Sequence, residues 1–147
     1  MPDKQTIERA RKDKRQGKSA STQAGEFVRE EFHHVREGKH GARSAKQAID
    51  IGLSKARRSG VKLPPPERGR ASGKVRRQAK RDLQRGRSGN GHVSRRRSRA
   101  VLGALRREGH GAASTAAISG QARSAARHRS ASSRSAAARR GARTRSR

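Results

Sequence analysis

The segment EEFHH at 30–34 holds two overlapping Glu-x-x-His pairs, Glu30 with His33 and Glu31 with His34. Residues three apart lie on the same side of a helix, and this spacing occurs in helical carboxylate metal sites. Such sites take their ligands from several packed helices, and a chain with few large apolar residues is expected to pack few. We therefore predict that these histidines are solvated or partly buried, and that the chain has no metal site and no cofactor.

The sequence has none of the common motifs for nucleophilic catalysis or phosphate transfer. The chain has no cysteine, which excludes a thiolate nucleophile and a cysteine zinc site. The P-loop, HExxH and G-x-S-x-G patterns are all missing. His40, His92 and His110 lie in glycine-rich turns without partners that converge on them. A lone serine or histidine needs a water-excluding pocket to be activated. We predict that the protein is not an enzyme.

Arginine is the residue type whose number and spacing favour a function. Its planar guanidinium binds phosphate through two parallel hydrogen bonds and stays charged at any cellular pH. The densest runs are 95–99 and 139–147. Basic residues in both halves of the chain are the predicted phosphate contacts: Arg57, Arg58, Arg76, Arg77, Lys80, Arg81, Arg95, Arg96, Arg97, Arg99, Arg106, Arg107, Arg139, Arg140, Arg143, Arg145 and Arg147.

The charge balance predicts a polyanionic partner. The 147 residues include 40 Lys and Arg against 11 Asp and Glu, a formal net charge of +29. Residues 1–66 have a net charge of +8 and residues 67–147 a net charge of +21. Neutralised phosphates release counterions, which drives binding that does not depend on sequence. The two aromatic residues, Phe27 and Phe32, lie on or beside a predicted apolar face, so stacking platforms for bases are missing.

Large apolar residues are too few for a compact globule over the whole length. Leu, Ile, Val and Phe together number 17 of 147, below the fraction at which a highly charged chain usually folds. Nine of the 18 large apolar residues fall between Phe27 and Leu63, and one follows Leu105. The predicted fold class is therefore mostly α with extensive disorder.

Periodicity and capping signals divide the chain into five parts. We expect a flexible charged N-terminus with a marginal helix at 1–20, a helical hairpin at 21–63 and a Pro-rich spacer at 64–71. A basic helix at 72–86 and an Arg-rich low-complexity tail at 87–147, with short helices at 99–107 and 114–127, complete the chain. The best amphipathic pattern follows the capping box Ser44-x-x-Gln47, and Gly60 is its predicted stop.

One internal similarity stands out. REGKHGARSAKQAI at 36–49 recurs approximately as REGHGAASTAAI at 107–118. Either the two segments are degenerate copies of one helix-turn-helix unit, or a biased composition produced the match by chance. The sequence leaves both interpretations open.

Residues 21–66, STQAGEFVREEFHHVREGKHGARSAKQAIDIGLSKARRSGVKLPPP, resemble the shared segment of a family of short basic bacterial proteins. That family is uncharacterised and often labelled DNA-binding or hypothetical. It has no established catalytic residues, so the resemblance implies no chemistry. The tail from Arg95 is similar in composition to the basic tails of linker histones and bacterial histone-like proteins.

These features together predict a non-enzymatic, largely sequence-independent DNA-binding protein of the nucleoid or a plasmid, located in the cytoplasm. An RNA-binding or ribosome-associated accessory protein is the first alternative, and a protein-interaction hairpin anchored by a basic tail is the second. A sequence-specific helix-turn-helix through 44–58 stays open. Residues 24–56 are the predicted surface for a homo-oligomer. No apolar run approaches the length of a membrane span, so no membrane partner is expected.

Overall fold

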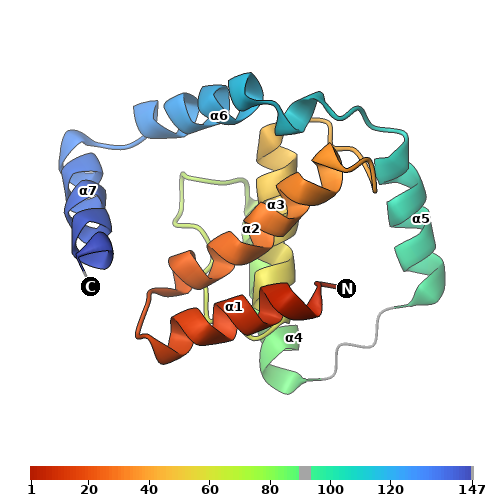
Figure 1. Cartoon of the computed structure of the whole chain (residues 1–147), viewed down its shortest axis with the longest axis horizontal. Helices are drawn as coiled ribbons and strands as arrows, with labels where there is room; N and C mark the ends of the chain where they lie inside the picture. The colour runs from red at the N-terminus through yellow and green to blue at the C-terminus, as the bar shows by residue number, and fades with distance from the viewer. Residues whose placement is uncertain (90–93, 147) are drawn as a thin grey trace.

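The computed structural model describes residues 1–89 and 94–146, which form seven α-helices and one 3-10 helix (Figure 1). The helices in chain order are α1 (Lys4–Arg15), α2 (Ala20–Arg36), α3 (Ala45–Arg58), α4 (Gly73–Ser88), α5 (Arg95–Arg106), η1 (Gly111–Ala113), α6 (Thr115–Arg127) and α7 (Ala131–Arg145).

Helices make up 72% of the chain, so the prediction of extensive disorder is wrong, whereas its mostly helical character is confirmed. The apolar count underestimated order because a helix does not need large apolar residues to form. Alanine and arginine are among the best helix formers, and these two residue types dominate the second half. The tail at 87–147 includes α5, α6 and α7 within its described part.

Serine caps fix where most of these helices begin. A serine at the N-cap accepts a hydrogen bond from the backbone N–H three residues later in six helices, which satisfies one of the free donors of the first turn. The capping serines are Ser19, Ser44, Ser72, Ser94, Ser114 and Ser130. At α3 the side chain of Gln47 also accepts from the backbone N–H of Arg43 at 2.7 Å.

The first half of the core lies where α1, α2 and α3 meet. Ala10, Ala24, Phe27, Ala56 and Val61 are buried together there. A Cβ on Gly52 would lie 2.7 Å from the Cα of Val28, so α2 and α3 cross at a distance that only glycine permits. Because alanine and glycine line the contacts, the helix backbones approach closely and few large side chains are needed.

The second core cluster joins the two halves of the chain. Phe32, Val35 and Ala48 of the first half pack with Ala112 and Ala113 of η1. Ala117 and Ile118 of α6 cover this cluster from outside. The tail predicted as low-complexity at 87–147 therefore contributes residues of η1 and α6 to the core.

The turns of the two similar segments pair with each other. The N–H of Gly41 donates to the carbonyl of Leu105 at 2.9 Å, and the N–H of Ala42 donates to that of Gly109 at 3.0 Å. A Cβ on Gly41 would lie 1.9 Å from the carbonyl oxygen of Glu108, so glycine is required for this approach. Each segment consists of a helix end, a glycine-rich turn, a serine cap and a new helix.

Helices α5 and α7 lie outside the bundle that α1 to α4 form (Figure 1). In Figure 1, α4 lies beside α3, while α5 and α7 stand apart on opposite sides of the molecule. The chain anchors α5 through the turn that follows it and α6 through the contacts of η1 with α2 and α3. The basic side chains of α5 and α7 are therefore open to solvent over most of the helix surface.

Candidate functional site

Most of the predicted phosphate contacts are exposed arginines on α4, α5 and α7. Exposed predicted residues are Arg58, Arg77, Lys80, Arg81, Arg95, Arg96, Arg97, Arg99, Arg106, Arg107, Arg139, Arg140, Arg143 and Arg145. Arg147, and His92 of the histidines considered above, lie outside the described residues. On α4 the buried Ala79 and Asp82 face α3, and Arg77, Lys80 and Arg81 lie on the opposite, exposed side.

Two predicted contacts are used within the fold. The buried Arg57 donates from Nε to the carbonyl of Leu63 at 3.2 Å and from a terminal nitrogen to that of Pro64 at 3.3 Å. Burial lowers the pKa of the Arg57 guanidinium below its usual value. The half-buried Arg76 donates to the carbonyl of Pro66 at 3.0 Å. These two arginines hold the Pro-rich segment against α3 and α4. Because Arg57 is also buried, we leave it out of the candidate interface.

Carboxylates neutralise the basic residues in the first half but not in the second. Ion pairs such as Arg9 with Glu26 at 2.6 Å and Lys46 with Asp50 at 3.3 Å are distributed over residues 3–82. Within the described part of residues 83–147 no arginine forms an ion pair, and Glu108 is the one acidic residue. The arginines of α5, α6 and α7 are thus available to an external anion.

The first turn of α5 concentrates positive charge. Arg95, Arg96 and Arg97 are its first three residues, and the turn has no acidic residue. The N-terminus of a helix has a partial positive charge, which is unfavourable for three arginine side chains in the first turn. A phosphate bound there would be attracted both by the arginines and by the helix N-terminus.

Five exposed arginines of the tail are absent from the predicted contacts: Arg87, Arg123, Arg127, Arg129 and Arg134; Arg85 at the end of α4 is exposed and absent as well. Arg123 and Arg127 are one helical turn apart on α6. Alternating alanine and serine with arginine every three to five residues is the signal that indicates these helices.

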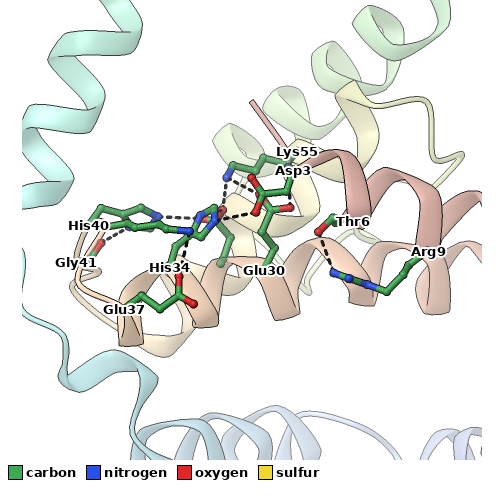
Figure 2. Close-up of polar contacts among 11 residues, drawn as sticks. Asp3, Thr6, Arg9, Glu30, His34, Glu37, His40, Gly41 and Lys55 are labelled. Atoms are coloured by element: carbon green, nitrogen blue, oxygen red, sulfur yellow. Dashed lines mark hydrogen bonds and ion pairs between the residues drawn. The ribbon is translucent and has the colours of Figure 1, made fainter.

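A second group of polar residues lies between α1, α2, α3 and the turn after α2, and all of them except Asp3, whose side chain is 57% exposed, are buried or partly buried. It consists of Asp3, Glu30, Glu31, His34, His40 and Lys55, and we call it the buried polar cluster. Glu30, Glu31, His34 and His40 are all less than 10% exposed. In Figure 2, His34 lies between His40 on one side and Asp3, Glu30 and Lys55 on the other.

Lys55 binds the two adjacent glutamates of the buried polar cluster. Its Nζ is 3.4 Å from Oε1 of Glu30 and in direct contact with Oε1 of Glu31. Oε2 of Glu30 accepts from the backbone N–H of Asp3 at 3.2 Å. Oε2 of Glu31 is buried without a hydrogen-bond donor.

The two histidines flank Glu31. Nε2 of His40 is 3.5 Å from Oε2 of Glu31, and Nδ1 of His34 is 3.9 Å from Oε1 of the same residue. Nε2 of His34 is 3.4 Å from Oδ2 of Asp3. Sequence reasoning gave His40 no converging partners, and this was wrong, because the turn at 37–44 folds back onto α2 and places His40 beside Glu31.

An exposed ion pair lies next to this cluster. Lys39 and Glu37 are 3.0 Å apart. The hydrogen bond between them lowers the pKa of the Glu37 carboxyl and raises the pKa of the Lys39 ammonium. This pair is solvated and does not neutralise the buried carboxylates.

Residues 4–67, fewer than half of the chain, match a family of unknown function (DUF6496). The match starts further toward the N-terminus than the predicted resemblance over 21–66. It supports neither the DNA-binding label nor the bacterial origin that the resemblance implied, and the likeness of the tail to histone-like proteins likewise has no support. No curated protein and no solved structure matches the chain.

None of the helices in the described part of the chain is long and apolar enough to cross a membrane. The apolar residues of the predicted self-association surface at 24–56 are largely used inside the chain. Ala24, Phe27, Ala48 and Ala56 are all buried in the two core clusters.

Proposed function

We propose that this protein is a non-enzymatic protein that binds duplex DNA with little regard to sequence. The observation behind this proposal is the set of unpaired arginines on α5, α6 and α7. Residues 84–147 include 17 arginines and one glutamate, a net charge of +16.

Arginines at this density favour a partner with regularly repeated phosphates. Duplex DNA presents one phosphate charge per about 1.7 Å of axis, and each contact releases condensed counterions. The exposed basic residues are distributed over α5, α6 and α7, which lie outside the bundle of α1 to α4 in Figure 1. This arrangement suits contacts with several stretches of phosphate backbone more than insertion of one recognition helix.

The aromatic residues argue against recognition of unpaired bases. Phe27 is 1% exposed and Phe32 is 8% exposed, so neither ring offers a stacking surface. Proteins that bind single strands and RNA loops depend on such surfaces. We therefore place duplex DNA ahead of single-stranded or looped RNA.

The helix that would have to read bases is also unsuited to that role. Ala45, Ala48, Gly52 and Ala56 of α3 are buried against α2 and the second half of the chain. α3 contacts α2, α4 and α6, which leaves little of its surface for a DNA groove. Base-specific recognition through 44–58 is accordingly not part of this proposal.

Binding competition tests this function. The full chain is mixed with a labelled 30-base-pair duplex and challenged with a duplex of unrelated sequence, a single strand, or a duplex RNA at the same salt concentration. We expect the two DNA duplexes to compete within about threefold of each other and the single strand to compete less well. Preference for duplex RNA, or for one DNA sequence by 100-fold or more, would contradict the proposal.

A further inference from the structure

We propose that Glu31, His34 and His40 form a binding site for a divalent first-row transition metal ion such as Zn²⁺. One ligand atom from each of the three side chains lies within 4.8 Å of the other two, and all three residues are buried. The proposal is independent of the DNA-binding function, because none of these residues belongs to the basic surface.

Hydrogen bonding fixes which nitrogen of His40 is free. Its Nδ1 is 3.0 Å from the backbone carbonyl oxygen of Gly41, and a carbonyl only accepts, so Nδ1 carries the proton. In the neutral ring Nε2 then has a lone pair, which faces Oε2 of Glu31 at 3.5 Å. Two acceptors face each other in a buried space, and a cation between them satisfies both.

His34 has the same arrangement. Its Nε2 lies 3.4 Å from Oδ2 of Asp3, which favours a proton on Nε2. Nδ1 then presents its lone pair toward Glu31 at 3.9 Å. Histidine ligands typically donate their other N–H to a carboxylate or a backbone carbonyl, and here Asp3 and Gly41 supply one of each.

The charge of the buried polar cluster favours a divalent ion. Asp3, Glu30 and Glu31 are three carboxylates, and Lys55 is the one lysine or arginine in contact with them among the described residues. With neutral imidazoles, Glu30, Glu31 and Lys55 sum to −1, and the exposed Asp3 adds a negative charge that solvent screens. Lys55 contacts Oε1 of Glu31 and leaves Oε2, the oxygen without a donor, for the metal.

Two imidazoles and one carboxylate select the metal class. Such a set suits Zn²⁺ and its first-row neighbours, whereas Mg²⁺ and Ca²⁺ prefer oxygen ligands. Zinc ligand bonds measure about 2.0–2.2 Å, so one ion would draw the three side chains slightly together. Because His40 belongs to the turn that pairs with 105–109, the ion would fasten this turn to α2.

Metal titration of the full chain, first freed of metal with a chelator, tests the site. Matched variants are His40→Gln and His33→Gln, since His33 is exposed and adjacent to His34. We expect Zn²⁺ to bind one per chain and raise the melting temperature of the wild type and of His33→Gln alike. His40→Gln should bind Zn²⁺ at least ~100-fold more weakly.

Absorption of bound Co²⁺ in the visible range gives a second readout, which does not depend on melting. Its d–d bands should appear in the wild type and in His33→Gln, and be lost in His34→Gln. If the metal-free variants fail to fold by circular dichroism, X-ray absorption of the Zn²⁺-loaded wild type decides, through scattering from two imidazoles. Equal affinity of all variants, no uptake of Zn²⁺, or the absence of imidazole scattering would overturn the proposal.

Discussion

Arg57 and Arg58 are neighbours in the sequence, yet the fold assigns them opposite surroundings. The Arg57 residue is 5% exposed and donates to two backbone carbonyls, whereas the Arg58 side chain is 39% exposed. The positions on α3 differ by about 100° around the helix axis, which turns Arg57 toward the Pro-rich segment and Arg58 toward solvent and α4.

We expect Arg57→Gln to destabilise the fold and Arg77→Gln, at an exposed position of α4, to leave it nearly unchanged. Loss of the charged hydrogen bonds of Arg57 should cost about 2 kcal/mol. Thermal or urea unfolding of the two variants measures this difference. Equal melting temperatures would mean that the contacts of Arg57 contribute nothing to stability.

Gly52 and Gly25 give a second pair of opposite expectations. A Cβ at 52 would lie 2.7 Å from backbone of α2, whereas one at 25 would meet nothing within 4 Å. Gly52→Ala should destabilise by about 1–3 kcal/mol, because the helices must separate. Gly25→Ala should stabilise by about 0.5–1 kcal/mol, because alanine favours the helix. An unfolding midpoint of Gly52→Ala equal to or above that of the wild type would show that α2 and α3 are not in close contact at Gly52.

For single residues, the sequence predicts which side chains share a helix face, but not which side chains from other elements lie next to them. The spacing of Glu31 and His34 indicates a shared helix face. His40 joins them only because the glycine-rich turn reverses the chain, and this reversal has no periodicity to detect. Likewise nothing in the sequence separates the buried Arg57 from the exposed arginines.

The helices themselves follow local signals. The capping box at Ser44 precedes α3, and Ser114 occupies the corresponding place before α6. α7 has neither large apolar residues nor an amphipathic pattern, which is why sequence reasoning proposed no helix there. Its Ser130 cap and its alanines are sufficient to define a helix.

The pairing of the two similar segments predicts an asymmetry between their glycines. Gly41 and Gly111 occupy matching places in REGKHGA and REGHGA, but only a Cβ at Gly41 would strike backbone, at Glu108. Gly41→Ala should therefore separate the turns and loosen η1 and α6, whereas Gly111→Ala should be tolerated. Hydrogen exchange of Ala42 and of the α6 amides measures the effect. Unchanged protection in Gly41→Ala would contradict the pairing.

Over the whole molecule, the apolar count gave the wrong conclusion about order. It assumed that burial of large side chains must offset the entropy of every residue. In the structure, alanine and glycine allow the helices to pack closely without large side chains. In addition, Ala112 and Ala113 of η1 pack into the core and so connect the second half of the chain to it. Composition therefore indicated the helical class, but not how much of the chain is ordered.

Charge is also distributed over the whole molecule. The bundle of α1 to α4 contains ten of the 11 acidic residues between positions 3 and 82, and the helices beyond it contain Glu108 alone. A polyanion should therefore be attracted most strongly to the second half of the chain. This asymmetry allows a test in which the same number of positive charges is removed either from the first half or from the second half of the chain, and the effects on binding are compared.

The salt dependence of duplex binding tests the DNA-binding account most directly. With about eight phosphate contacts, the slope of log affinity against log salt should be near −7 for the full chain, at roughly −0.9 per phosphate. One variant replaces Arg139, Arg140, Arg143 and Arg145 of α7 with Gln. The matched control replaces Arg11, Lys12, Lys14 and Arg15 of α1, which are also exposed.

Both variants lose four charges, so net charge alone predicts equal effects. Our account predicts that the α7 variant flattens the slope by about 2–4, while the α1 control changes it by less than about 1. Equal slopes for the two variants, or an affinity that hardly changes with salt, would contradict the account.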